Sequence, residues 1–554
     1  MADALPTLEL FFKILMQHRL ARRPASVFGF SSRTRAQREL FDRVRREAEQ
    51  RNATGYKLLE KAVQRRNTKL YNKLLVDASN HGCLSLVEEA SRNMRTTGVP
   101  ENEWTYGARI NAFARSGRLR EAQAVLHEAD ACGIASTNAL LAPLVKALLE
   151  PRFVPGGGPS AASRIAEAAS LVDDRLGVDG AAERPNARVL NTLLRGCKRI
   201  APHTAPAVLR RFESYVGTPH PPVTRMLMAE IACMDLDGSR AAAMVQDIAV
   251  DARLLHEVAI AYALRGERAA AGGMLDAAAA AMEADRTSED ADGGGAAAPR
   301  RLQRRGTPRS VLTAQQALIG RYVSGKDEPS IVTGGAAHSP SVSWPFANRA
   351  AAAASAAHLL DLLHGRRRIC VEVGAGAGEW LVAQAKAHPE VAWVGIEPQL
   401  DRVHHIWCHL QLHRLHNVHV CASEASGVFA HGLPAASVDA VHVRFPYPPP
   451  MELSEIIGPS PPDGALGGDT FLDDVIRVVR PGGALRVLTN DAVYCAWLLV
   501  RIHRHPQARR RLRSLHGQDG FERAVPGGVG PSFFESVFEA RGLTDWYNLA
   551  FEVR

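Results

Sequence analysis

Cysteines are few in this chain, and none of them lies in a pattern that binds metal or builds a disulfide framework. The eight cysteines are spread over 554 residues without a Cys-x-x-Cys pair. Paired thiols at that spacing are what zinc knuckles and disulfide-stapled domains require. The sequence therefore predicts a reducing compartment, cysteines that serve as small core residues, and no metal site.

Long apolar runs are also missing. No stretch of about eighteen uncharged apolar residues occurs, which is the length that a membrane-spanning helix needs. Hydrophobic residues still make up 46% of the chain, which is ample for buried cores. We therefore expect a soluble protein of roughly two to four domains that does not enter a membrane.

Acidic residues are absent between Glu9 and Glu39, where arginine, lysine and serine recur. This composition is typical of an organelle transit segment over residues 1–40, and it predicts a chloroplast or mitochondrial location. The alternative is a basic first helix of the folded protein, which Asp3 and Glu9 favour and which fits the cytoplasm or nucleus. The formal net charge of +9 indicates a polyanionic partner, with nucleic acid as the first expectation.

The N-terminal half contains an internal repeat. Three pairs of residues recur at a spacing of 35: Tyr71 and Tyr106, Gly82 and Gly117, and Gly98 and Gly133. Glycines that end helix-length segments predict a helical hairpin as the repeating unit. Because one hairpin cannot bury its apolar face alone, we expect hairpins stacked into an α-solenoid over residues 41–283.

Segments 71–75, 111–122 and 189–197 resemble the pentatricopeptide repeat (PPR) family. The resemblance implies single-stranded RNA bound along the solenoid, with paired side chains reading each base. The reading positions hold Lys73 with Glu103 and Ala108 with Asn138, and neither pair favours base reading. The alternative is a helical scaffold that binds protein or raises RNA affinity without reading bases. Four arginines are candidates for such phosphate contacts: Arg109, Arg115, Arg118 and Arg120.

Residues 284–330 differ in composition from what precedes them. They contain a charged stretch, a Gly-Gly-Gly-Ala-Ala-Ala run and a basic segment at 299–305. A segment of this kind lacks the apolar residues to form a core, so it predicts a disordered linker between halves that move independently.

Expected strands and helices alternate in the third part of the chain, residues 331–554. Strands are expected at 368–373, 392–396, 418–422, 438–444 and 483–488, and helices at 379–388, 400–415 and 470–479. This alternation predicts a Rossmann-like α/β domain, with a mostly parallel sheet covered on both faces and ligands at the carboxyl ends of the strands.

The most informative motif lies at the end of the first of these strands. Glu372 is followed by glycines at alternate positions, and Glu397 ends the next strand: the glycines are Gly374, Gly376 and Gly378. Glycines let the backbone approach a ligand closely, and a carboxylate at the second strand end can accept both hydroxyls of a ribose. A dinucleotide fingerprint would need a glycine where Glu379 stands. The pattern therefore favours S-adenosylmethionine (SAM).

The same domain resembles the tRNA (guanine-N7) methyltransferase family. Matching pieces run in the family's order and include 371–378, 388–389, 395–397, 415–418, 424–425, 445–446, 479–483, 532–535 and 549–552. The resemblance implies SAM as cofactor, tRNA or another RNA as substrate, and a noncatalytic protein subunit as a further partner. The SAM-binding residues that it implies, with the glycine loop, are Glu372, Gly374, Gly376, Gly378, Glu397 and Glu424. The residues it implies near the target guanine are Phe445, Thr489, Ser532 and Glu535.

The chain departs from that family after Phe445-Pro446, where an aspartate and a basic cluster are replaced by Tyr447-Pro448-Pro449-Pro450. No lysine or arginine occurs between Arg444 and Arg477, which should weaken capture of a phosphate backbone. The candidate catalytic carboxylates are Glu452, Asp491 and Glu535. The alternative function is a PPR-type RNA-binding or processing factor whose methyltransferase domain is catalytically degenerate.

One further set of residues has metal-ligand chemistry. His405, His409 and His413 recur every four residues on an expected helix, with Cys408 beside them. The same helix fills a structural position in this fold, and no carboxylate partner is evident, so we predict no metal there.

Overall fold

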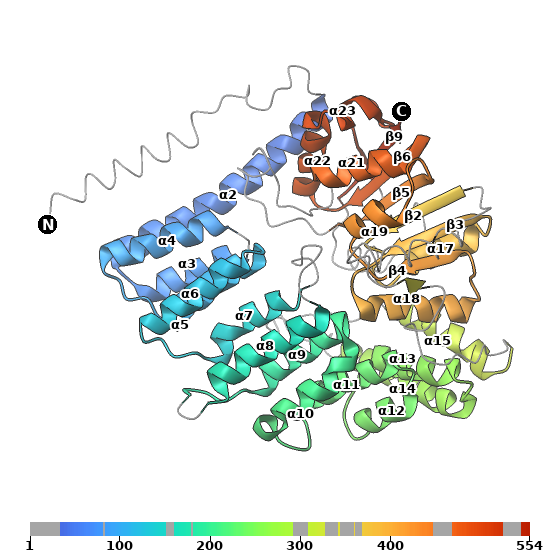
Figure 1. Cartoon of the computed structure of the whole chain (residues 1–554), viewed down its shortest axis with the longest axis horizontal. Coiled ribbons are helices and arrows are strands. Elements are labelled where there is room, and N and C mark those ends of the chain that lie inside the picture. The colour runs from blue at the N-terminus through green and yellow to red at the C-terminus, as the bar shows by residue number, and fades with distance from the viewer. Residues whose placement is uncertain are drawn as a thin grey trace.

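A computed structural model of the chain describes residues 34–80, 83–150, 160–178, 181–291, 309–326, 342–343, 359, 368–446, 468–524 and 545–554. They form a helix-rich N-terminal half and a C-terminal half built on a mixed α/β sheet (Figure 1). None of the helices in these ranges is long and apolar enough to cross a membrane.

The N-terminal half is a succession of short helices. They are α2 (Arg35–Arg65), α3 (Thr68–Asn80), α4 (Leu84–Thr97), α5 (Glu103–Arg115), α6 (Leu119–Ala131), α7 (Asn138–Leu148), α8 (Ala161–Leu176), α9 (Ala187–Ile200), the 3-10 turn η3 (Pro202–Thr204), α10 (Ala205–Val216), α11 (Pro222–Met234), α12 (Gly238–Val245), α13 (Ala252–Leu264) and α14 (Arg268–Ala291). Gly98, Gly117 and Gly133 follow helices with positive φ, as expected for helix-ending glycines. Gly82 lies outside the described residues.

These helices are arranged in two layers. Helices α3, α5, α7, α9, α11 and α13 pack side by side in that order, and each packs against the helix that follows it. Polar contacts join neighbouring members of the first layer: Thr105 donates to Asn72 at 2.8 Å, Thr137 to Glu103 at 2.6 Å, and Thr224 to Asn191 at 2.8 Å. The first layer is thus held by apolar packing and by hydrogen bonds between successive units.

A nine-stranded sheet forms the centre of the C-terminal half. Its strands are β1 (Val342–Ser343), β2 (Arg368–Val373), β3 (Val391–Ile396), β4 (Val418–Cys421), β5 (Val438–Arg444), β6 (Val479–Thr489), β7 (Leu512–Ser514), β8 (Glu522–Ala524) and β9 (Trp546–Val553). The order is β1-β4-β3-β2-β5-β6-β9-β7, with β8 also paired to β9. Strands β1 to β6 are parallel, and β7 and β8 each run antiparallel to β9, as does β6. The chain reverses its direction of winding at β2, which has β3 on one side and β5 on the other.

Helices cover both faces of this sheet. Helices α17 (Glu379–Ala387) and α18 (Leu400–His413) share one apolar core with β2, β3 and β4. Helices α19 (Ala425–Gly432), α21 (Asp469–Val478) and α22 (Ala492–Arg504), with the short α23 (Ala508–Arg511), pack in a second core. The alternating strands and helices expected from residue 368 to 488 are present. The boundary near 479 differs, because β6 begins at Val479, which pairs with Val438.

The expected disordered linker is partly wrong. Residues 309–323 form helix α15 (Arg309–Val323), in which Ile319 is 0% exposed and Tyr322 is 2% exposed. These two residues lie three apart and therefore share one face of the helix, and the hydroxyl of Tyr322 donates to the carbonyl of Gln411 on α18 at 3.2 Å. Helix α14 also continues to Ala291, inside the same expected linker. Residues 292–308 and 327–330 lie outside the described ranges.

The expectation that the two halves move independently is also wrong. A single cluster of buried side chains contains Ala259 and Ile260 of α13, Ile319 of α15, and Ile406 and Trp407 of α18. Burial of apolar surface from both halves in one core favours one docked arrangement. Side chains of α13 and α15 therefore cover α18, so that the core of the α/β half continues into the helical half.

Helix α2 makes a second connection between the halves, at its N-terminal end (Figure 1). Leu40 is 3% exposed within the α/β core, and the amide of Gln37 donates to the carbonyls of Gln518 at 2.8 Å and Asp519 at 3.0 Å. Arg43 lies 2.7 Å from Asp545. The expected boundary after residue 40 therefore falls inside a helix, and residues 35–40 are its first turns. Residues 1–33 lie outside the described part of the chain.

We predict that Ile319→Ala lowers the free energy of unfolding by about 2–5 kcal/mol, because it removes a fully buried side chain from the core shared by both halves. Chemical denaturation monitored by circular dichroism would measure this change. Leu515→Ala serves as the control, since Leu515 is 47% exposed. An Ile319→Ala protein as stable as the control would show that α15 does not contribute to the core.

Candidate functional site

The candidate site residues meet at one edge of the sheet. The strand ends are in register there: Val373 pairs with Ile396 and Val443, and Ile396 pairs with Cys421. On the far side of β5, Arg444 pairs with Leu488. The residues that follow these strand ends are therefore neighbours, and they include Gly374, Glu397, Glu424, Phe445 and Thr489. The edge lies where the winding reverses, which is the usual ligand position in such folds.

The glycine loop between β2 and α17 has the backbone conformation that glycine permits. Gly374, Gly376 and Gly378 have φ angles of 72°, 61° and 84°. Gly378 is also closely packed, since a Cβ at this position would lie 2.6 Å from Cγ1 of Ile406 on α18. A side chain would therefore strain the loop in its backbone and against its neighbouring helix.

Glu397 fixes this loop from the neighbouring strand. Its carboxylate is 2% exposed and accepts the backbone N–H of Gly376 at 2.9 Å through Oε2 and that of Gln399 at 3.0 Å through Oε1. Arg402 Nη1 lies 3.6 Å from Oε2. Burial raises the pKa of Glu397, against the influence of Arg402 and the two hydrogen bonds. Each oxygen has a further lone pair that can accept a ribose hydroxyl.

Glu372 is a buried carboxylate without a full set of partners. It is 3% exposed, and its Oε2 has no hydrogen-bond partner among the described residues. Burial raises its pKa well above the ordinary value, although Arg444 opposes this effect. An unpartnered buried carboxylate oxygen is unfavourable unless a cation or donor meets it. The ammonium group of a SAM methionine moiety has this chemistry, so the residues present fit the cofactor.

Aromatic side chains line the β5 side of the same edge. The ring centroids of Phe445 and Trp546 are 5.5 Å apart in an edge-to-face arrangement, and Phe445 has a φ of 47°. The guanidinium carbon of Arg444 lies 4.8 Å from the centroid of the Trp380 ring. Sequence reasoning missed Trp380, Arg444 and Trp546. Trp380 lies two residues after Gly378, and this closeness to the glycine loop was the feature of the sequence that could have identified it.

Three of the remaining candidate site residues lie in the described part of the chain, at the ends of separate elements. Glu424 is exposed at the N-cap of α19, and Thr489 is 0% exposed at the end of β6. Asp491 caps α22: its Oδ1 accepts the N–H of Tyr494 at 2.8 Å, and its own N–H donates to Thr489 at 3.1 Å. This capping role is structural, and the sequence pattern did not indicate it. Glu452, Ser532 and Glu535 lie outside the described residues.

The three histidines that recur every four residues lie on α18, the helix that contacts α9 and α13 of the helical half. The ring centroids of His405 and His409 are 4.7 Å apart, and those of His409 and His413 are 6.1 Å apart. Burial lowers the pKa of His405 to about 4 and that of His409 well below its ordinary value. The described residues contain no group of three or more histidine, cysteine or acidic side chains arranged to hold a metal ion. His405 and His409 therefore favour the neutral form, and His405 lines the cavity between the halves.

The positions expected to read bases are largely occupied by internal contacts. Ala108 is 5% exposed and Asn138 is 6% exposed, and the Asn138 amide donates to Glu183 at 2.8 Å. Glu103 accepts from Thr137, as described above, whereas Lys73 is exposed. Ala108 and Asn138 are buried between helices, which agrees with the expectation that this pair does not favour base reading.

One of the four arginines expected to contact phosphates is occupied inside the helical half. Arg109 is buried and forms a two-pronged contact with Glu128 at 3.1 and 2.7 Å. Arg118 pairs with Glu121 at 2.8 Å but is exposed, as are Arg115 and Arg120, so these three remain candidates.

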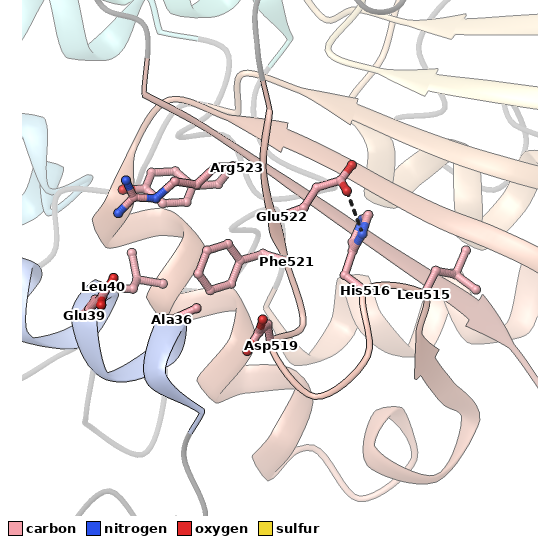
Figure 2. Close-up of a pocket in the computed structure, with 10 residues that line it drawn as sticks. Ala36, Glu39, Leu40, Leu515, His516, Asp519, Phe521, Glu522 and Arg523 are labelled. Atoms are coloured by element: carbon pink, nitrogen blue, oxygen red, sulfur yellow. Dashed lines mark ion pairs between the residues drawn. The ribbon is translucent and has the colours of Figure 1, made fainter.

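A cavity separate from the candidate site residues lies between α2 and β8. Its volume is about 470 Å³, and Figure 2 shows Phe521 between the α2 side chains and the strand, with Glu522 turned toward His516. His516 Nδ1 and Glu522 Oε2 are 3.4 Å apart. None of the loop glycines or buried site carboxylates lines this hollow, so it belongs to the joint between α2 and the α/β half and is separate from the candidate cofactor site.

Comparison with known proteins identifies the α/β half. A family model described as "Putative methyltransferase" matches residues 366–452. The chain is 33% identical to a tRNA (guanine-N(7)-)-methyltransferase of Chlamydia felis over 179 residues, which are 32% of this chain and 73% of that protein. The chain belongs to this methyltransferase family. It is also 32% identical to the protein of the same name from Nitrobacter hamburgensis over 146 residues, 26% of this chain and 54% of that protein.

Solved methyltransferase structures were also found to be similar to part of the chain. A structure titled "Structure of an Antibiotic Related Methyltransferase" covers 36% of this chain and 94% of its own, with 16% identity and a TM-score of 0.27. Family membership makes this protein a SAM-dependent methyltransferase, and SAM is its cofactor. Within this methyltransferase, Glu372, Glu397 and the glycine loop are the described residues whose chemistry fits the cofactor.

We predict that Gly378→Ala weakens SAM binding at least several-fold, because an alanine is strained at a φ of 84° and its Cβ would approach Ile406 to 2.6 Å. Isothermal titration calorimetry with SAM would measure the loss. Gly482→Ala is the matched control, since Gly482 also has a positive φ, of 81°, but has no atom within 4 Å of an added Cβ and lies away from the loop. Equal SAM affinity in both variants would contradict the assignment of this loop to the cofactor.

Proposed function

We propose that this methyltransferase transfers a methyl group from SAM to N7 of a guanine in tRNA. The observation that carries the proposal is the row of strand ends that places Glu372, Glu397 and the glycine loop beside Phe445. Relatives with 29–33% identity over 26–32% of this chain bear the name of this activity. The buried carboxylates account for the cofactor, and the aromatic edge accounts for a planar base.

The chemistry asks little of a general base. N7 of guanine carries an unprotonated lone pair, so no proton has to leave before the methyl group arrives. Bound SAM supplies an electrophilic methyl group on a sulfonium. The residues of this chain therefore contribute mainly by orienting the two reactants, an effect that can be worth on the order of 7 kcal/mol. The capping role of Asp491 is compatible with this mechanism, because no proton-accepting carboxylate is required.

Phe445, which is half-buried, is the described side chain best suited to the guanine ring. Phe445 follows β5 directly, and its ring meets Trp546 edge to face. Stacking of a base on an aromatic side chain contributes about 1–3 kcal/mol in single-stranded recognition. In this proposal Phe445 orients the base, and Thr489, buried at the end of β6, sets the position of the neighbouring loop through its contact with Asp491.

We propose that the helical half is a PPR-like solenoid that presents RNA without reading its sequence. The paired layers of α3 to α14 support a repeat architecture. The burial of Ala108 and Asn138 supports sequence-independent contact. The composition of residues 1–33 supports an organellar location as a further part of this proposal.

An exposed arginine patch on the α/β half supplies positive charge for an RNA backbone. It consists of Arg504, Arg509, Arg510, Arg511 and Arg513, on α22, α23 and β7. Part of this charge is engaged internally, because Arg511 donates to the Arg554 carbonyl and Arg513 pairs with Glu552. The patch lies about 20 Å from the reacting edge, since the 13-residue α22 leads away from it. It supports contact with a substrate larger than a nucleoside.

We predict that the purified full-length protein transfers labelled methyl groups from SAM to unmodified bulk tRNA, and that nucleoside analysis identifies N7-methylguanosine. Glu397→Ala should abolish transfer, because it removes the anchor of the glycine loop and the acceptor for the ribose hydroxyls. Absence of transfer by a protein that binds SAM would reject the proposed function and favour an RNA-binding factor with an inactive domain.

We predict that replacing Arg509 and Arg510 together by glutamine weakens tRNA binding and lowers the salt dependence of affinity by about one unit of slope per lost phosphate contact. Filter binding at several salt concentrations would measure this effect. The control replaces Arg210 and Arg240 by glutamine, two exposed arginines on α10 and α12. The same change of slope in both variants would indicate general charge attraction and would contradict a phosphate-binding role for the patch.

A further inference from the structure

The helical half reaches the first turn of α18 through a cluster of charged side chains. Nζ of Lys198, on α9, lies 2.8 Å from Oε2 of Glu230 on α11 and 3.4 Å from Oδ2 of Asp401 on α18. Arg253 of α13 pairs with both Glu230 and Glu257. The side chain of Lys198 is 18% exposed and that of Glu230 is 9% exposed. Asp401 is the member of this cluster that belongs to the α/β half.

The members of the central pair remain charged. Burial lowers the pKa of Lys198, but the carboxylates of Glu230 and Asp401 outweigh this effect and its pKa is raised. Burial raises the pKa of Glu230, but Lys198 and Arg253 outweigh it and its pKa is lowered. Lys198 keeps Glu230 as a partner if Asp401 moves away, but it loses the second carboxylate that stabilises its charge in a largely buried place, so this movement is unfavourable.

A chain of contacts leads from Asp401 to the cofactor loop. Oδ1 of Asp401 accepts the N–H of Arg402 at 3.1 Å, and the Arg402 guanidinium lies 3.6 Å from Oε2 of Glu397. The same oxygen of Glu397 accepts the N–H of Gly376 at 2.9 Å. Glu397, whose carboxylate anchors the glycine loop, is therefore four residues from Asp401, the side chain that contacts the helical half.

Apolar packing does not fill this part of the interface. A cavity of about 200 Å³ lies between the halves, lined by Lys198, Arg253, Ala377, Asp401 and Arg402 among others. Ala377 belongs to the glycine loop, so the cavity reaches this loop. Where a cavity replaces packed side chains, fewer contacts fix the adjacent helix end. The start of α18 is therefore held by its ionic contacts together with the packing of Val403 and Leu400 against the core.

We propose that Lys198 and Asp401 are positioning residues for the cofactor. Through this ion pair the helical half holds the first turn of α18, and Arg402 and Glu397 pass the constraint to the glycine loop. The inference rests on SAM as the cofactor and is independent of the RNA and of the atom that is methylated. Coupling between two sites is reciprocal, so bound SAM must in turn stabilise the contact of α9 and α11 with α18.

A double-mutant cycle tests the ion pair. Asp401→Asn keeps an oxygen for the Arg402 N–H but removes the charge, Lys198→Met removes the cation, and the third protein carries both changes. We expect each single change to raise the dissociation constant of SAM by about 3- to 30-fold, and the double change to add little more. Lys198→Arg should restore most of the affinity. The charge of Asp401 also interacts favourably with the dipole of α18, because it lies near the N-terminus of this helix. This interaction does not require Lys198, so if it alone mattered, the effects of the two substitutions would be additive.

A second measurement does not depend on the Lys198 variants. Hydrogen exchange of α9 and α11 in the full-length protein should slow when S-adenosylhomocysteine binds, and this response should shrink in Asp401→Asn. The control is Asp173→Asn, which breaks a 2.9 Å pair with Arg211 between α8 and α10. Any one of three results would overturn the proposal. These are unchanged SAM affinity in folded Asp401→Asn, additive effects in the mutant cycle, and hydrogen exchange of α9 and α11 that does not change when the ligand binds. These readouts require no RNA and no methyl transfer, so they stand apart from the test of the proposed function.

Discussion

The packing of α18 between the sheet and the helical half is the constraint on which the rest of the structure depends. On one side Ile406 and Trp407 belong to the core that covers β3 and β4, and Ile406 lies against the loop glycine at 378. On the other side the helix meets α9, α13 and Tyr322 of α15. A helix that is buried on both sides transmits displacement, because close-packed interiors deform little. The position of the helical half is thus part of the geometry of the cofactor site.

Electrostatics at the site follow from the burial of two carboxylates. Glu372 and Glu397 have raised pKa values because burial disfavours the charged form. Glu397 is compensated by two backbone N–H groups and Arg402, whereas Glu372 has an oxygen without a partner among the described residues. This difference suits two different roles. Glu397 is a fixed structural anchor of the glycine loop, and Glu372 is a group whose cost of burial falls when a cation binds.

The repeat pattern and the linker show where sequence reasoning succeeded and where it failed. The glycines at 98, 117 and 133 end helices because each adopts a left-handed backbone conformation, which is a local property. The burial of Asn138 and the pairing of Arg109 with Glu128 depend on which helices become neighbours, and a sequence spacing does not contain this information. The prediction of a disordered linker failed at α15 in the same way, because charged and glycine-rich residues precede this helix in the sequence. Its apolar face is buried only through contact with α13 and α18, which the sequence does not reveal.

The sequence by itself determined the alternation of strands and helices, the glycine loop, and the carboxylates of Glu372 in β2, Glu397 after β3 and Glu424 after β4, because these depend on local periodicity and on residue type at strand ends. It could not determine that Asp491 caps a helix, that the rings of Phe445 and Trp546 meet, or that Lys198 meets Asp401, which stands 203 positions later in the sequence. Those relations arise from packing between distant segments. Only the tertiary structure decided them, because charge pairing and burial act between neighbours in space.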